Sequence, residues 1–302
     1  MAGGQERVLR RRIRSVQSTR KITKAMELIA ASRIVRAQAR IAANRSFRDG
    51  MARILRITAA ADPTAAKKLL GTPETVARVG IVAIVGDRGL AGSYNSGVLR
   101  ATERLVAEHR RNGIETTVWT VGKKAPSYFR YRGIEIAGSF VGIADRPEFA
   151  DARDIAATVA APFVAGEIDL IQMVSTRFIS AGTQRVENLQ VLPLALPEAD
   201  EEAAEPADHE LVGYTEFEPE PEKLLAELAP RALEAEIFAA LLEGAAGFFT
   251  AQQRAMAAAT DNADELVRTL TRVMNRARQD AITTEIMEIV GGAEALRQSK
   301  GA

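Results

Sequence analysis

The sequence predicts an α/β protein in which a long antiparallel coiled coil of the N- and C-terminal helices accompanies a central α/β domain. Residues 5–60 contain no proline, and their one glycine is Gly50. Residues 254–290 contain neither proline nor glycine. Between these stretches, β-branched runs alternate with helical patterns, which is typical of a mostly parallel sheet covered by helices.

The N-terminal stretch is predicted to form one helix from about Glu6 to about Ala60, within a segment 1–62. At about 1.5 Å per residue, it would be roughly 80 Å long. Its apolar residues form two triplets, each with a step of four followed by a step of three, the spacing of a coiled-coil seam. An alternative is a pair of amphipathic helices folded over a compact core. The seam residues are Leu9, Ile13, Val16, Ile22, Met26 and Ile29.

The start of this helix is strongly basic, with eight Lys or Arg and no Asp or Glu between Arg7 and Lys24. Such a run is often a solvated helix face, and it also suits an acidic partner or nucleic acid. Because the charges point in several directions around the helix, a rod surrounded by partners is favoured.

A linker with Asp62-Pro63 and Gly71-Thr72-Pro73 precedes a Rossmann-like α/β domain, residues 76–196. The run from Val79 to Val85 is apolar and β-branched, as in a strand buried on both faces. The remaining predicted elements are strands at Glu115–Val121, Ile134–Val141, Asp169–Phe178 and Gln184–Leu194, and helices at Ser93–Asn112, Lys123–Tyr131 and Pro147–Ala165.

A glycine-rich turn, Gly86–Asn95, follows the first strand and raises the question of nucleotide binding. Its spacing is G-x-x-G-x-x-G, which differs from the dinucleotide fingerprint, and no Gly-Lys-Ser/Thr follows. Asp87 and Arg88 stand where a backbone would approach a phosphate. A tight turn from strand to helix explains the glycines, so no cofactor is predicted.

An acidic, proline-bearing loop, 197–221, separates the domain from a C-terminal helical segment, 222–302. Pro230 either opens the last helix or kinks it. A helix from Arg231 to Val290 would be roughly 90 Å long and needs a partner, which the N-terminal helix supplies. Its predicted seam is Leu266, Leu270, Val273, Ala277, Ala281 and Thr284.

Composition excludes several classes of function. The chain has no cysteine, and its two histidines lie far apart in sequence, so no metal, disulfide or thiol chemistry is predicted. The net charge is +1, which gives no overall drive toward nucleic acid. No run approaches about 18 apolar residues, and the N-terminus lacks a secretory pattern. We expect a cytosolic protein, or one held at a membrane by partners.

Three stretches resemble the gamma subunit of F-type, proton-transporting ATP synthases. These are Ile13–Gln38, the turn Gly89–Asn95, and Ala258–Leu296 with its Ile282-Thr283-Thr284-Glu285. They occur in the family's order and span nearly the whole chain.

The resemblance implies the central rotor shaft, which couples proton flow through the membrane c ring to ATP synthesis or hydrolysis. The implied partners are the alpha and beta subunits of the alpha3-beta3 head, the epsilon subunit and the c ring. It also implies a subunit without catalytic residues, peripheral at the cytoplasmic face of the cell membrane, with no direct bilayer insertion and no nucleic acid. A nucleic-acid-binding coiled coil and a Rossmann-like nucleotide-binding enzyme remain the alternatives.

The resemblance also assigns contact residues. Arg20, Lys21, Lys24 and Met26 match a segment near the acidic lever of beta. Gln252 stands where many relatives have an arginine, and Arg254 is the nearest charge, about 200° away around a helix. Further expected contacts with beta are Gln279 and Thr283, and the expected apolar bearing is Ile286, Ile289, Val290, Ala293 and Leu296.

Overall fold

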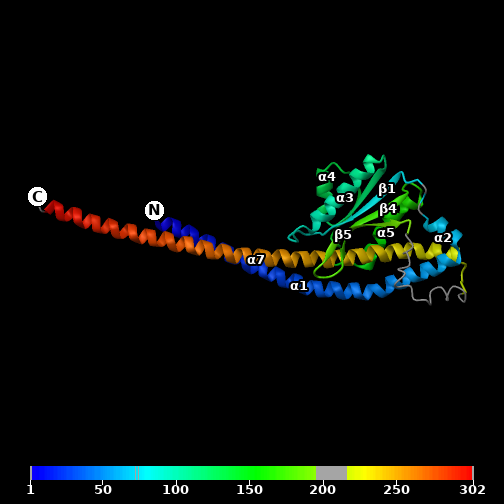
Figure 1. Ribbon diagram of the computed structural model, residues 1–302, viewed down its shortest axis with the longest axis horizontal. Helices are drawn as coiled ribbons and strands as arrows, with labels where there is room; N and C mark the ends of the chain where they lie inside the picture. Colours follow the sequence, from blue (N-terminus) through cyan, green and yellow to red (C-terminus); the bar gives the residue numbers. More distant parts are fainter. Residues whose placement is uncertain (1, 72, 74, 195–215, 301–302) are drawn as a thin grey trace. The chain divides into compact units, whose positions relative to one another are not determined.

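A computed structural model describes residues 2–71, 73, 75–194 and 216–300, and the side chains of all of these except 2–4, 68–69 and 294–300. The chain forms two compact units, one of residues 1–29 with 253–302 and the other of residues 30–252. The long helices α1 (Ala2–Ala61) and α7 (Pro221–Lys300) contribute to both units (Figure 1).

The two predicted terminal helices are confirmed, with small differences at their ends. Helix α7 begins at Pro221 and continues through Pro230, so Pro230 does not open it. A proline is well tolerated at the first position of a helix, where its missing N–H would have no partner. The predicted linker contains one further helix, α2 (Pro63–Leu70), whose first turn is capped by the Asp62 carboxylate accepting from the Ala65 N–H at 2.9 Å.

In the unit of residues 1–29 and 253–302, α1 and α7 pair antiparallel. Arg20 lies 2.6 Å from Asp264, and the hydroxyls of Thr23 and Thr260 lie 2.8 Å apart. Residue numbers increase from Arg20 to Thr23 along α1 while they decrease from Asp264 to Thr260 along α7, as an antiparallel pair requires. Its buried seam consists of Ile13, Thr23, Met256, Thr260, Ala263 and Leu270.

Four residues of the predicted seam are not buried in the observed seam. Ile22 and Ile29 of α1 are 60% and 52% exposed, and Leu266 and Val273 of α7 are 39% and 45% exposed. Adjacent positions differ by about 100° around a helix, and in α1 the seam runs through Thr23 next to Ile22. The predicted seam of α1 omitted Thr23, and the predicted seam of α7 omitted Met256, Thr260 and Ala263.

The pairing ends near residue 282 of α7. By the register of the Arg20–Asp264 pair, the first residue of α1, Ala2, lies opposite about Ile282. Ala277 and Ala281 are half-buried, whereas Thr284 and every described side chain that follows it are exposed. The predicted seam therefore fails at Thr284, because α1 no longer accompanies α7 there.

The unit of residues 30–252 contains a five-stranded sheet in the order β3-β2-β1-β4-β5. The first four strands are parallel, and β5 is antiparallel to β4, as the predicted hairpin requires. The strands are β1 (Arg78–Ile84), β2 (Glu115–Val121), β3 (Ile136–Phe140), β4 (Leu170–Phe178) and β5 (Gln184–Leu192). Each predicted strand is confirmed, with differences of one or two residues at its ends.

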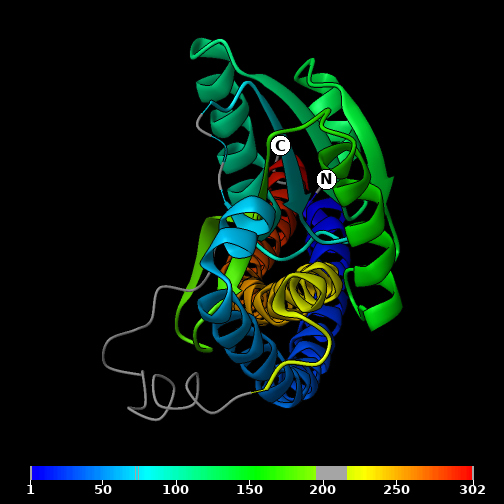
Figure 2. The ribbon, with the colours of Figure 1, turned by 90° about the vertical axis from the view of Figure 1, so that its right-hand side faces the viewer.

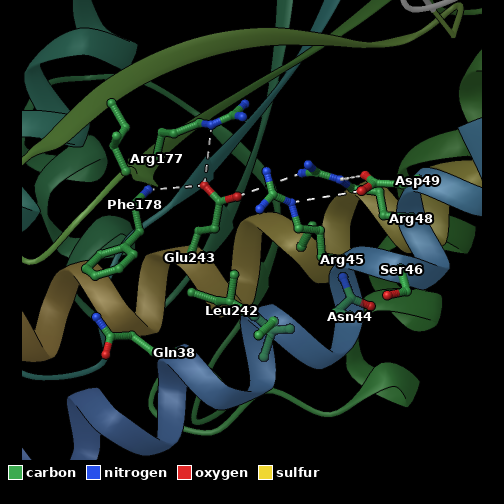
Figure 3. A pocket seen from close by; sticks show the side chains of 14 residues that line it. Gln38, Asn44, Arg45, Ser46, Arg48, Asp49, Arg177, Phe178, Leu242 and Glu243 are labelled. Atoms are coloured by element: carbon green, nitrogen blue, oxygen red, sulfur yellow. Dashed lines mark hydrogen bonds and ion pairs between the residues drawn. The ribbon is translucent and has the colours of Figure 1, made fainter. Parts of the chain in front are cut away.

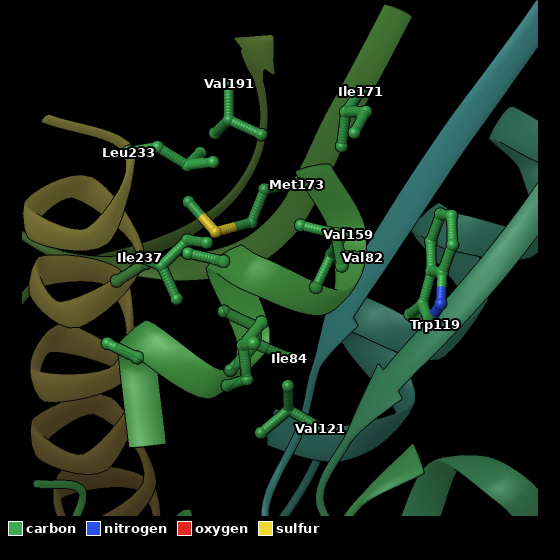
Figure 4. Close-up of a cluster of buried hydrophobic side chains, with 14 of the residues drawn as sticks. Val82, Ile84, Trp119, Val121, Val159, Ile171, Met173, Val191, Leu233 and Ile237 are labelled. Atoms are coloured by element: carbon green, nitrogen blue, oxygen red, sulfur yellow. The ribbon is translucent and has the colours of Figure 1, made fainter. Parts of the chain in front are cut away.

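Helices cover both faces of the sheet (Figure 2). One apolar core lies between the sheet and helices α3 (Tyr94–Arg111) and α4 (Lys124–Tyr131). The other joins the sheet to α5 (Phe149–Val164) and α7, where Leu233 and Ile237 point toward Met173 (Figure 4). Helix α7 is thus a structural member of the α/β domain.

Of the predicted acidic loop, residues 197–215 lie outside the described part of the chain. Within the described residues, no helix combines the length and the apolar character needed to cross a membrane.

Candidate functional site

The predicted contact residues of α1 lie on the helix pair, and two of the three cations have acidic neighbours within the chain. Arg20 pairs with Asp264 at 2.6 Å, and Lys24 donates to Glu27 at 3.0 and 3.1 Å. Lys21 is exposed and Met26 is half-buried. Ion pairs as exposed as these contribute about 0–1 kcal/mol, so a partner's carboxylate can replace the internal one at little cost.

The seam beneath these cations contains a buried hydroxyl pair. Thr23 donates to the Arg20 carbonyl at 3.0 Å, and Thr260 donates to the Met256 carbonyl at 2.9 Å. The two hydroxyl oxygens lie 2.8 Å apart. Because each hydroxyl has a single proton, one of them donates to the other in place of its own backbone carbonyl. A polar pair in an apolar seam favours the one register in which both members are satisfied.

Gln252 and Arg254 of α7 have different environments. Gln252 is 7% exposed and belongs to the unit of residues 30–252, whereas Arg254 is exposed. Every residue from Gly244 to Thr250 is also buried, because α7 is enclosed here. This burial argues against a contact with a partner through the Gln252 side chain. The contact with beta that the resemblance implies for Gln252 stays a prediction.

The remaining predicted residues of α7 are exposed. They include Gln279 and Thr283, and the bearing residues Ile286, Ile289 and Val290 are 54%, 72% and 59% exposed. Ala293 is exposed too, and the side chain of Leu296 lies outside the described part. Sequence reasoning missed Met287, which is 68% exposed beside Ile286. Such an exposed apolar cluster is typical of a surface that contacts another protein.

The glycine-rich turn is held by a carboxylate. Asp87 accepts hydrogen bonds from the backbone N–H groups of Lys123 at 3.1 Å, Gly142 at 2.8 Å and Ala144 at 3.0 Å. These donors follow β2 and β3, so Asp87 joins the carboxyl ends of three neighbouring strands. Asn95 completes the turn by accepting from Gly86 and donating to the Arg88 carbonyl.

This arrangement opposes a phosphate site. Nucleotides bind to open α/β sheets at the carboxyl ends of the strands, where free backbone N–H groups approach the phosphates. Here three such groups already bind Asp87, whose negative charge would repel a phosphate.

Two glycines of this turn have identifiable roles. A Cβ atom at Gly86 would lie 2.9 Å from the Phe248 ring of α7, so only glycine permits this close approach. Gly92 has a φ of +55°, a conformation that glycine adopts without strain. The turn thus packs closely against α7. Leu90 also has a positive φ, +63°, and is 61% exposed.

Tyr94 fastens the same turn to α7. Its hydroxyl donates to the Gly244 carbonyl at 2.8 Å, and its ring meets the Phe248 ring edge-on with centroids 5.5 Å apart. Burial raises the pKa of Tyr94 well above its ordinary value, so the phenol stays protonated and keeps this donor.

Glu243 is the one charged residue of α7 between Ile237 and Gln253, and sequence reasoning missed it despite that signal. Its carboxylate accepts from the Phe178 N–H at 3.1 Å and lies 3.8 Å from both Arg177 and Arg48 (Figure 3). It borders a cavity of about 570 Å³ between α1, α7 and the end of β4. Burial raises the pKa of Glu243, although the Phe178 N–H and the two arginines oppose this.

A second cavity of about 770 Å³ lies between α1, α7 and the loop before α5. It is basic, because five arginines face two acids, Asp145 and Glu148. Asp145 is bound by Arg88 at 2.9 Å and lies 3.9 Å from Arg33. The arginines are Arg33, Arg36, Arg40, Arg88 and Arg146.

Among the described residues, no three His, Asp or Glu side chains lie close enough together to hold an ion.

Comparison with known proteins agrees with this geometry. A profile of the ATP synthase family matches residues 5–296. The ATP synthase gamma chain of Frankia casuarinae is 47% identical over 297 residues, covering 97% of this chain and 98% of that protein. The gamma chain of a Parafrankia species is 46% identical with the same coverage, and that of Streptomyces coelicolor is 41% identical over 299 residues, 97% of each chain.

Solved structures share the fold. A chain from the Euglena gracilis mitochondrial ATP synthase, in its OSCP/F1/c-ring assembly, superposes with a TM-score of 0.69 at 17% identity, covering 99% of this chain and 97% of that one. One from the central stalk and c ring of the Tetrahymena thermophila mitochondrial enzyme gives 0.61 at 24% identity, covering 79% and 99%. Full-length similarity and shared architecture together show that the chain belongs to the ATP synthase gamma-chain family.

Proposed function

We propose that this chain is the central rotor shaft of an F-type ATP synthase. It couples proton flow through the membrane c ring to ATP synthesis or hydrolysis on the alpha3-beta3 head. The observation that carries the proposal is the identity of 46–47% to ATP synthase gamma chains over nearly the full length of both proteins.

The helix pair suits a shaft mechanically. Two helices in one register resist bending better than a single helix, and the Thr23–Thr260 pair opposes slippage between them. Rotation of an asymmetric shaft alters which conformation each catalytic subunit prefers, because its contacts differ between the open and closed states. The shaft needs no reactive group for this work.

The contact residues divide by chemistry. Arg20, Lys21 and Lys24 offer positive charge to an acidic segment of beta, and Met26 packs beside them. The basic cavity beside α1 extends the same positive character along the chain. Gln279 and Thr283 offer neutral hydrogen bonds to a beta loop. The exposed residues Ile286, Ile289 and Val290, with Ala293 and Leu296, form a bearing that binds without directional bonds.

The subunit itself is non-catalytic, and it is peripheral at the cytoplasmic face of the cell membrane, held there by epsilon, the c ring and the head. Support for a non-catalytic role comes from how its polar groups are used. Asp87, Glu243 and Tyr94 are engaged by backbone groups of their own chain, which is the pattern of structural residues.

Co-purification tests the proposal directly. The tagged chain, expressed in a cell that lacks its own gamma subunit, should bring down alpha and beta in a complex that hydrolyses ATP. A chain that assembles with neither subunit would contradict the proposal.

The two alternatives have their own measurements. A Rossmann-like enzyme would bind nucleotide. The rotor function predicts instead that calorimetry of the isolated chain with ATP or NAD shows no heat of binding. A nucleic-acid-binding coiled coil would use Arg7–Lys24, and a gel shift with a steep dependence on salt would favour it.

A further inference from the structure

Helix α1 packs against α7 through apolar residues at two separate places, and Phe47 of α1 also meets the Phe149 ring of α5 edge-on with centroids 6.4 Å apart. Ile34 packs in a cluster with Ala245 and Phe249 of α7. Further along, Leu55 packs in another cluster with Leu225. Between them, the segment of α1 from Gln38 to Asp49 borders the cavity of about 570 Å³. Here the apolar contact between α1 and α7 is incomplete.

Glu243 bridges this gap from α7. One carboxylate oxygen lies 3.8 Å from Arg48 of α1, and the other accepts from the Phe178 N–H and lies 3.8 Å from Arg177 (Figure 3). Three elements, α1, α7 and β4, therefore meet at one side chain that is 13% exposed.

The end of β4 depends on this contact for a hydrogen bond. Strand β4 pairs with β1 as far as Val174 and continues to Phe178 on the edge of β5. Glu243 supplies an acceptor for the Phe178 N–H at this overhang. The β4–β5 hairpin is thereby tied to the helices.

The contact at Glu243 orients Arg48 and Arg177 more than it stabilises the fold. Both arginines stand at 3.8 Å, longer than a charge-assisted hydrogen bond of about 2.7–2.9 Å. Desolvation of a largely buried carboxylate offsets much of the attraction at such distances. A neutral, well-packed side chain would stabilise the fold at least as well, but it would not attract Arg48 and Arg177.

We propose that Glu243 is a positioning residue for torque transfer. It holds Arg48 of α1 and the end of β4 against α7, so that the α/β domain and both helices turn together under load. Torque from the c ring enters through the α/β domain, and it reaches α1 across this bridge. The inference rests on the proposed rotor function.

The test compares loaded and unloaded turnover of the assembled synthase in inverted membrane vesicles. Glu243→Gln keeps an acceptor for Phe178 but loses the charge, and Arg48→Met removes the partner on α1. Arg45→Met is the matched control, because Arg45 lines the same cavity and lies 3.9 Å from Asp49.

ATP hydrolysis with an uncoupler present measures unloaded rotation, and ATP-driven acidification of the vesicles measures rotation against a proton gradient. We expect Glu243→Gln and Arg48→Met to hydrolyse ATP as the parent does, and to acidify about two- to threefold more slowly, a typical size for coupling within a contact network. The double variant should be no worse than either single variant, since both break one link. Arg48→Lys, which keeps the charge, should recover at least half of the loss.

Acidification equal to that of Arg45→Met in both single variants would overturn the inference. An equal loss of hydrolysis and acidification would also overturn it, because that pattern indicates a general structural defect. If Glu243→Gln fails to assemble, Arg48→Met and Arg48→Lys decide the question alone. Failure of the unaltered chain to join alpha and beta would instead contradict the rotor function itself.

Discussion

The hydroxyl oxygens of Thr23 and Thr260 lie 2.8 Å apart in the buried seam between α1 and α7. Thr260→Val keeps the shape of the side chain and removes the hydrogen bond across the seam, while the Thr23 hydroxyl keeps the Arg20 carbonyl as its acceptor. We expect the helix pair to lose about 1 kcal/mol of stability, the usual net value of a hydrogen bond. Thermal unfolding of the purified chain, followed by circular dichroism, measures the effect.

The exposed substitution Thr269→Val is the control, and it should leave unfolding unchanged. Thr23→Val combined with Thr260→Val should cost no more than Thr260→Val alone, because both changes remove the same hydrogen bond between the helices. Equal stability of all variants would show that the pair has no influence on the seam.

Asp87→Ala removes the acceptor of three backbone N–H groups at the carboxyl edge of the sheet. Lys123 and Gly142 are exposed, so water can bind their N–H groups, and the lost charged acceptor should cost about 1.5–3 kcal/mol, the typical value for hydrogen bonds to charged groups. Denaturant unfolding should show the loss, whereas Glu135→Gln on the exposed surface should not. A stable Asp87→Ala chain would mean that these loops hold their positions by other contacts.

Gly86→Ala places a methyl group 2.9 Å from the Phe248 ring. Overpacking of this kind typically costs about 1–3 kcal/mol. Gly89→Ala in the same turn is a close control, because the nearest atom to its new Cβ, on Lys124, lies 3.9 Å away. Unfolding midpoints should therefore fall for Gly86→Ala alone, and Phe248→Leu should relieve part of the strain. Equal midpoints would show that α7 can move aside.

Gln252→Arg introduces the residue that the family resemblance implies here, yet position 252 is 7% exposed in this chain. A guanidinium buried without a prepared partner should cost at least about 2 kcal/mol. We expect a lower unfolding midpoint and less assembled complex on native gels, while Arg254→Gln at an exposed position has little effect. A fully stable variant whose ATP hydrolysis becomes more sensitive to salt would show instead that position 252 faces an acidic partner.

The stability of the chain should also respond to pH through Glu243, whose pKa burial raises above its ordinary value of 4.5. Arg48, Arg177 and the Phe178 N–H oppose the rise, and the nearby Glu236 adds to it. Below about pH 4.5 the carboxyl is protonated in both folded and unfolded chains. As the pH rises, the unfolded chain releases this proton first, so ionisation favours unfolding until the folded pKa is passed.

Glu243→Gln should therefore raise the unfolding midpoint at pH 7 and give a smaller gain at pH 4. Glu265→Gln, at an exposed site, should give no pH-dependent difference. A gain of the same size at both values would show that ionisation of Glu243 has no part in it. A more stable variant with weaker coupling is the expected trade-off at a positioning residue.

Local sequence patterns determined most of the secondary structure of this protein. Residues 5–60, with Gly50 as their one glycine, and residues 254–290, with no proline or glycine, predicted α1 and the middle of α7, because such a backbone can satisfy its own hydrogen bonds without interruption. The part of α7 before residue 254 contains Pro230, Gly244 and Gly247 and is helical all the same. Runs such as Val79–Val85 produced buried strands, and their alternation with helices produced a mostly parallel sheet. Family membership also followed from the sequence, since motifs such as Ile282-Thr283-Thr284-Glu285 occur in order along the chain.

Tertiary structure decided which side chains of these elements are buried and which contacts they make. Burial of Thr23 in place of Ile22 depends on the register between two helices more than 200 residues apart in sequence. Three further features depend on how α7 packs against the sheet and α1. They are the burial of Gln252, the close contact of Phe248 with Gly86 and the interactions of Glu243. No local pattern encodes such contacts, because each arises only when distant segments exclude water from the same space.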